Sequence, residues 1–152
     1  VLAGSEPAIS AFRAACTYPH LAPGHIAGSA DDLPDHALAA AARAALDAHH
    51  AALLDAALAD YAARAPQGRA TCEIGTAARA AAMGAVQSLI VCMDATVPGR
   101  LAADGAVTLG GEDDLVEEVA LAALAAGAQV LAVRREEVPE GRELAAVLRH
   151  PV

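Results

Sequence analysis

Histidine side chains are the first residues in this sequence that could support chemistry. His20 and His25 flank a loop rich in proline and glycine, close to Asp31 and Asp32. Imidazole and carboxylate groups bind zinc and transfer protons, so this loop is a candidate metal site or the active site of a small hydrolase. The residues match no fixed ligand spacing, however, so the sequence favours a loop without metal and predicts no cofactor.

A second pair of histidines, His49 and His50, follows Asp47 in a segment that is predicted to be helical. Adjacent residues on a helix point about 100° apart, so the two imidazoles are poorly placed to bind one ion. A solvated helix face is the simpler interpretation.

Three cysteines, Cys16, Cys72 and Cys92, are far apart and form no Cys-x-x-Cys pair. This favours free thiols in a reducing compartment, and hence a cytoplasmic protein. A nucleophilic cysteine needs a base and surroundings that stabilise the thiolate, and Cys72 is the better candidate because it lies near a predicted helix start. No serine-nucleophile or phosphate-loop motif is present, and no catalytic residue is assigned.

The charge balance opposes direct binding to nucleic acid. The 152-residue chain carries ten basic residues, all Arg, against nineteen acidic ones, which gives a net charge of −9. A phosphate backbone requires clustered cations, and the one local cluster, which includes Arg134, Arg135 and Arg142, is interleaved with glutamates. No apolar run reaches the roughly 20 residues that a membrane-spanning helix needs.

Two helix–glycine–strand units organise the predicted fold. The first covers Ala78–Met93 around Gly84, and the second covers Val119–Val133 with Gly127 between its helix and its strand. Glycine commonly ends a helix in the left-handed conformation, and the nearly continuous apolar runs that follow are typical of strands covered on both faces. The sequence therefore predicts an α/β fold, a three-layer α/β/α sandwich preceded by a long helix.

The other expected elements follow from apolar periodicity and breaker residues. Helices are expected over residues 6–16, 32–65, 72–83 and 114–126, and strands over residues 1–4, 86–93, 128–133 and 144–148. The first strand is expected to lack its partners, and residues 17–30 are expected to form a linker or an ordered loop.

Local signals mark several helix ends and turns. Thr71 is expected to cap one helix, and Asp114 with Glu117 matches the spacing of a capping box. Asp104-Gly105, placed between two short apolar runs, predicts a hairpin. Gly110-Gly111-Glu112 is interpreted as a turn that enters the following helix.

Short strings of small and apolar residues follow one another in a particular order. They are Gly68-Arg-Ala-Thr71, Ala77-Ala-Arg-Ala80, Gly84-Ala-Val86, Leu89-Ile-Val91, Val97-Pro-Gly99, Gly127-Ala-Gln-Val-Leu-Ala-Val133 and Leu144-Ala-Ala-Val-Leu-Arg149. This order resembles the C-terminal part of the bacterial homologues of the archaeal–eukaryotic release factors, with family eleven as the expected member. The resemblance implies that residues 1–30 end a ribonuclease-H-like middle domain and its linker. Residues 31–152 would be an α/β domain like the third domain of release factors and Pelota.

The resemblance also implies a function. In better-known relatives the third domain contacts a translational GTPase, so a non-catalytic module that docks on such a GTPase or on the ribosome is expected, within a translation or ribosome-rescue protein. Connecting loops commonly carry function, which makes Asp104, Arg134, Arg135 and Arg142 the expected contact residues. Two alternatives stay open: a metal site or hydrolase at His20 and His25, and homo-oligomerisation through the long helix.

Overall fold

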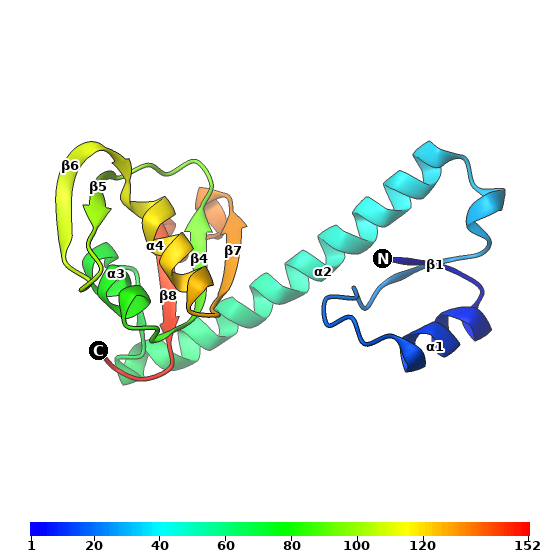
Figure 1. Ribbon diagram of the computed structural model, residues 1–152, viewed down its shortest axis with the longest axis horizontal. Coiled ribbons are helices and arrows are strands. Elements are labelled where there is room, and N and C mark those ends of the chain that lie inside the picture. The colour runs from blue at the N-terminus through cyan, green and yellow to red at the C-terminus, as the bar shows by residue number, and fades with distance from the viewer. The chain divides into compact units, whose positions relative to one another are not determined.

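The computed structural model describes residues 1–152 (Figure 1). The chain forms two compact units, Val1–Leu53 and Leu54–Val152, and the boundary between them falls inside helix α2 (Asp35–Arg64). The assignment of residues 1–30 and 31–152 to two release-factor domains stays a prediction.

The first unit contains a short parallel pair of strands. Strand β1 (Leu2–Gly4) pairs with β2 (His25–Ala27), with Leu2 opposite His25. Two expectations were therefore wrong: the first strand has a partner within the chain, and part of the expected loop is a strand. The pairing depends on residues about 20 positions apart, which local sequence patterns do not reveal.

Helix α1 (Glu6–Ala15) connects these strands, as expected from the sequence. Ile9 is its buried residue, whereas Phe12 is 50% exposed. The Arg13 guanidinium donates to the carbonyls of Ala22 and Pro23, at 3.0 and 2.7 Å, and so fixes the loop that precedes β2.

Helix α2 is the long helix expected from the sequence, and it has 30 residues. It begins at Asp35, after a short 3-10 turn over Ala30–Asp32, so Asp32 does not cap it. Leu33 is extended because the ring of Pro34 disfavours the helical conformation in the residue before it. Within the second unit Leu54 and Ala57 are the buried residues of α2.

A four-stranded mixed sheet forms the centre of the second unit (Figure 1). Its order is β3 (Ala70–Thr71), β8 (Leu144–Leu148), β4 (Val86–Cys92) and β7 (Gln129–Val133). Strand β7 runs parallel to β4, whereas β8 is antiparallel to both β4 and β3.

Helices cover both faces of this sheet. On one face, Leu89 and its neighbours pack against α3 (Ile74–Ala82) and α4 (Leu115–Ala125). Side chains alternate along a strand, so Ser88 points to the other face, where it lines a small hollow with Ala57 of α2. The predicted three-layer α/β/α arrangement is therefore confirmed in this unit.

The two helix–glycine–strand units are also confirmed. Gly84 and Gly127 have φ of +67° and +75°. The N–H of Ala85 donates to the Ala80 carbonyl at 2.8 Å, and the N–H of Ala128 donates to the carbonyl of Ala123 at 2.9 Å. Both helices thus end in a Schellman motif that turns the chain directly into a strand.

The cap of α3 differs from the prediction. Its N-cap is Glu73, whose carboxylate accepts the N–H of Gly75 at 2.8 Å and also that of Thr76. Thr71 belongs to β3 instead, because pairing with β8 keeps this residue extended, and its hydroxyl accepts the N–H of Glu73 at 3.0 Å.

The cap of α4 is confirmed in part. Asp114 caps the helix, and its carboxylate accepts the N–H groups of Val116 and Val97 at 3.0 and 3.1 Å. Glu117 does not complete a capping box; instead, the neighbouring Glu118 accepts the N–H of Leu101 and binds the preceding hairpin to the helix.

The hairpin predicted at Asp104-Gly105 is confirmed, with β5 (Pro98–Leu101) antiparallel to β6 (Val107–Asp114). The turn expected at Gly110–Glu112 was wrong, because β6 continues through it with a bulge. The register passes from Gly99 opposite Leu109 to Pro98 opposite Asp114. Gly110 and Gly111 have φ of +95° and +105°, which glycine adopts without strain.

Candidate docking surface

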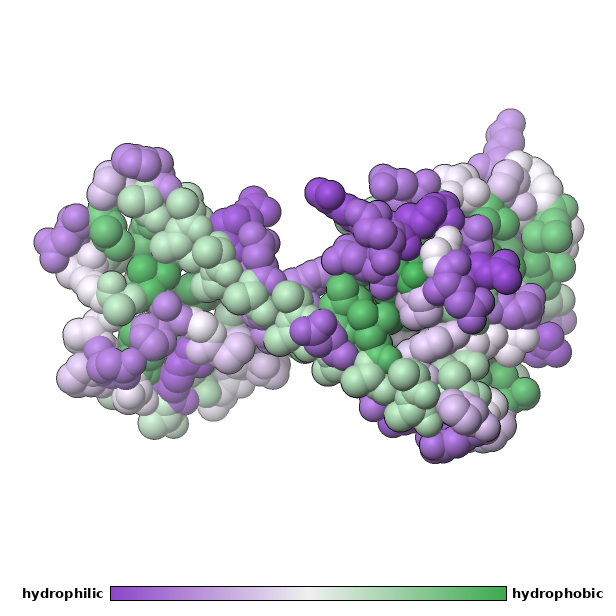
Figure 2. Space-filling view, turned by 180° about the vertical axis from the view of Figure 1, so that it is seen from behind, coloured by the Kyte–Doolittle hydropathy of each residue, from purple (hydrophilic) through white to green (hydrophobic).

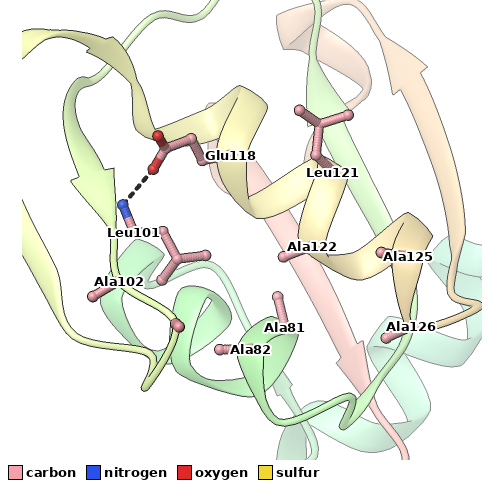
Figure 3. Close-up of a pocket in the computed structure, with 10 residues that line it drawn as sticks. Ala81, Ala82, Leu101, Ala102, Glu118, Leu121, Ala122, Ala125 and Ala126 are labelled. Atoms are coloured by element: carbon pink, nitrogen blue, oxygen red, sulfur yellow. Dashed lines mark hydrogen bonds between the residues drawn. The ribbon is translucent and has the colours of Figure 1, made fainter.

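An apolar groove of about 500 Å³ lies over the α3–α4 pair (Figure 3). Most of its lining is alanine, contributed by both helices, and its larger apolar side chains are Leu101 and Leu121. Small residues let two helices approach closely, and they leave a shallow channel where their side chains end. Leu121 is 57% exposed, so the wall of the groove is open to a partner.

Glu118 lies at the hairpin end of the groove, where its carboxylate accepts the backbone N–H of Leu101 (Figure 3). This hydrogen bond holds the end of β5 against α4. The hairpin therefore forms a fixed wall of the groove.

Arg149 binds the opposite ends of the same two helices. Its guanidinium donates to the carbonyl of Gly84 at 3.0 Å and to that of Gly127 at 3.3 Å. A cation at a helix C-terminus offsets the partial negative charge of the last carbonyls. Arg149 therefore contributes to the structure of the helix ends and is not part of a free basic patch.

Other apolar residues of the second unit are also exposed. Met83 follows α3 directly and is 64% exposed, and Leu124 on α4 is 53% exposed. Seen from behind, this unit carries hydrophilic residues interspersed with hydrophobic patches (Figure 2). The groove differs from scattered exposed residues because it combines apolar chemistry with a concave shape.

Asp104 lies in the hairpin turn, beside α3. A Cβ atom at the neighbouring Gly105 would lie 3.1 Å from the Cα atom of Arg79, which shows how closely the turn packs on the helix. Asp104, Gly75 and Arg79 line a hollow of about 340 Å³. The exposed Asp104 is therefore held in a defined position.

The predicted contact arginines lie in the loop between β7 and β8. Arg135 donates to the carbonyl of Gly141 at 3.1 Å, and Arg142 lies 3.8 Å from the carboxylate of Glu140. Such exposed ion pairs contribute little to stability. Arg134 makes no ion pair. No hydrogen bond or ion pair joins Asp104 to any of these arginines.

Cys72 lies in a polar hollow next to Tyr61, with its Sγ atom 3.0 Å from the tyrosine hydroxyl. Burial raises the pKa of the Cys72 thiol and also the pKa of Tyr61. A raised thiol pKa keeps cysteine in its weakly nucleophilic form at neutral pH. Cys72 was a candidate nucleophile because it lies near a helix start. Its buried environment does not favour that role.

The candidate metal loop has no structural support. His25 lies 3.1 Å from the carboxylate of Glu6, and His20 packs edge-on against Tyr18 with ring centroids 5.6 Å apart. Nowhere in residues 1–152 do three His, Cys, Asp or Glu side chains converge in a way that could hold an ion. None of the helices combines the length and apolar character needed to cross a membrane.

Sequence patterns alone did not identify the groove. The one signal for the groove in the sequence is the position of Leu121 and Leu124, which fall outside the apolar stripe of α4 that faces the sheet. Two leucines on the outer face of a helix indicate either a second packing surface or a binding surface, and the concave arrangement with α3 becomes visible only in three dimensions.

Comparisons with known proteins agree with this architecture. Residues 1–84 match bacterial archaeo-eukaryotic release factor family 3. No curated protein matches the chain.

Two solved structures share the fold. Saccharomyces cerevisiae Dom34 is 14% identical with a TM-score of 0.50, and the match covers 85% of this chain and 36% of Dom34. It is described as a translation termination-like factor involved in RNA quality control pathways and interacting with Hbs1. Archaeoglobus fulgidus Pelota is 13% identical with a TM-score of 0.51, over 99% of this chain and 49% of Pelota. The chain thus spans less than half the length of either protein.

The expected number within the group, eleven, is not confirmed, because the match is to family 3. The matched residues 1–84 make up more than half of the 152-residue chain. The chain therefore belongs to the bacterial archaeo-eukaryotic release factors, and this membership supports a translation-related role.

Proposed function

We propose that residues 54–152 form a non-catalytic docking module of a translation or ribosome-rescue factor, and that the module binds a translational GTPase or the ribosome. The observation that carries the proposal is the open apolar groove between α3 and α4. Family membership supports a partner from translation, and Dom34, which shares the fold, is described as interacting with Hbs1.

The groove matches a partner segment with aliphatic side chains. Burying the exposed half of Leu121 is worth roughly 1 kcal/mol, and the alanine floor adds area without losing side-chain entropy. A few well-packed residues near the centre of an interface commonly supply most of its binding energy, and Leu121 is the candidate for this role in the groove.

Charged residues outside the groove serve as secondary contacts in this proposal. Asp104 follows the groove-lining Ala102 and Ala103 directly, and Arg134, Arg135 and Arg142 lie in the β7–β8 loop. Charges at the rim of an interface mainly change the association rate and its salt dependence. Reversing them should therefore have smaller effects than a change inside the groove.

The test is co-sedimentation of the full-length protein with ribosomes, together with direct binding to purified translational GTPases. Leu121→Asp should weaken association at least tenfold, because it places a charge on the apolar wall. Leu109→Asp is the matched control, since Leu109 is 70% exposed in the same unit and does not line the groove.

If Leu121→Asp and Leu109→Asp weakened association equally, the groove would not be the binding surface. Failure of the unaltered protein to bind either ribosomes or any translational GTPase would overturn the docking function itself.

A further inference from the structure

Strand β7 is one of the two edge strands of the four-stranded sheet, and β3 is the other. Its sequence, Gln-Val-Leu-Ala-Val over Gln129–Val133, contains no charge and no proline, and its pairing with β4 has no bulge. Natural proteins usually protect an edge strand with one of these devices, because an open edge is a template for another strand. This edge has none of them.

The free edge carries unpaired backbone groups. The N–H of Met93 donates to the Val133 carbonyl at 2.9 Å, so the backbone of Val133 points toward β4. Successive residues of a strand direct these groups to opposite sides, so Val130 and Ala132 direct theirs to the outer edge. Neither residue makes a backbone hydrogen bond there.

The edge is also held in a fixed conformation. Leu131 and Val133 are 5% and 2% exposed, and they anchor the strand in the core. Ala132 is exposed and small, so it leaves room for a neighbouring chain. A preorganised edge loses little conformational entropy when another strand pairs with it.

A charge marks one end of this edge. Arg134 follows β7 directly, is exposed and has no ion pair. It is therefore available to bind a carboxylate on an incoming chain.

We infer that the free edge of β7 is a β-augmentation site. It pairs with an extended segment of a partner protein that has an acidic residue beside Arg134. Main-chain hydrogen bonds to Val130 and Ala132 supply the affinity, and Arg134 supplies selectivity. This surface is separate from the α3–α4 groove, because none of its residues lines the groove.

The experiment is an NMR titration of the 152-residue chain with the synthetic peptide acetyl-Thr-Val-Thr-Val-Asp-amide. Binding with a dissociation constant of about 1 mM or lower should shift the amides of Val130 and Ala132 and slow their hydrogen exchange. Two analogues, N-methylated either at both valines or at both threonines, form a matched pair. One should bind like the parent, and the other should bind at least tenfold more weakly, because only alternate amides face the edge.

Protein variants complete the test. Ala132→Lys places a charge on the edge without removing a hydrogen bond to β4, and it should abolish binding, whereas Ala106→Lys in the exposed hairpin turn should not. Arg134→Glu should prefer a peptide ending in Lys over the one ending in Asp. Equal binding of both N-methylated analogues, or no shift at Val130 and Ala132 at several times 1 mM, would overturn the inference.

Discussion

The two helix–glycine–strand units of this protein share one local pattern but occupy different places in the sheet. Both helices end in a Schellman motif at a glycine, and both continue into an apolar strand. β4 then lies between two neighbours, whereas β7 has a neighbour on one side only. The same local sequence therefore gives a core strand in one place and an open edge in the other, and long-range pairing decides which.

The largest expected difference between the two helix–glycine–strand units is the loss of stability when a core leucine is replaced. Leu89 in β4 is fully buried between α3, α4 and two strands, so Leu89→Ala should lower the free energy of unfolding by about 4 kcal/mol. Leu131→Ala in β7 should lower it by about 2 kcal/mol, because an edge relaxes more easily around a cavity. Urea unfolding measures both values. Equal losses would show that β7 is as constrained as β4.

The glycines should instead behave alike. Gly84→Ala and Gly127→Ala should each lower the free energy of unfolding by about 1 kcal/mol, because an alanine strains a positive φ. An added Cβ at Gly84 would meet Ala126 at an ordinary 3.7 Å, and at Gly127 it would meet nothing. The added methyl group therefore causes no clash at either position. Thermal unfolding would reveal a difference, and a loss confined to one glycine would contradict the equivalence of the two motifs.

The smallest expected effect concerns Glu73, the N-cap of helix α3. Hydrogen bonds from Thr76 and from the Gly75 amide lower the pKa of the Glu73 carboxyl in the folded protein. Its stabilising effect is then fully present above the unfolded value of about 4.3 and is lost as the pH falls through the lower folded pKa. Because Glu73 is exposed, the effect should be modest.

Urea unfolding between about pH 3 and pH 6 tests this. Glu73→Gln should flatten the dependence of stability on pH. Glu112→Gln, which changes an exposed carboxylate without a hydrogen-bond partner, should leave it unaltered. A pH dependence that persists in Glu73→Gln would place the responsible carboxylate elsewhere.

The features that follow from local chemistry could be predicted from the sequence. The two helix–glycine–strand units were predicted from Gly84, Gly127 and the apolar runs that follow them. The hairpin was predicted from Asp104-Gly105. The misses depend on contacts distant in the sequence. Strand β2 exists because it pairs with β1, and Thr71 is extended because β3 pairs with β8.

The candidate site was harder to predict than the fold. Asp104 was predicted as a contact residue from its place in a hairpin loop, and this stays a prediction; in sequence it directly follows the groove-lining Ala103. The groove itself requires Leu121 to stand beside the alanines of α3, and nothing in the separate sequences of the two helices specifies that distance. The open edge of β7 likewise depends on strand order, which no single strand encodes.

The position of β8 has a consequence for synthesis on the ribosome. This strand is buried at all five positions and lies between β3 and β4, yet it follows every other strand and helix in sequence. While it remains in the exit tunnel, β3 has no partner strand and β4 lacks one of its neighbours. The second unit should therefore complete its sheet only after Leu148 has emerged from the tunnel.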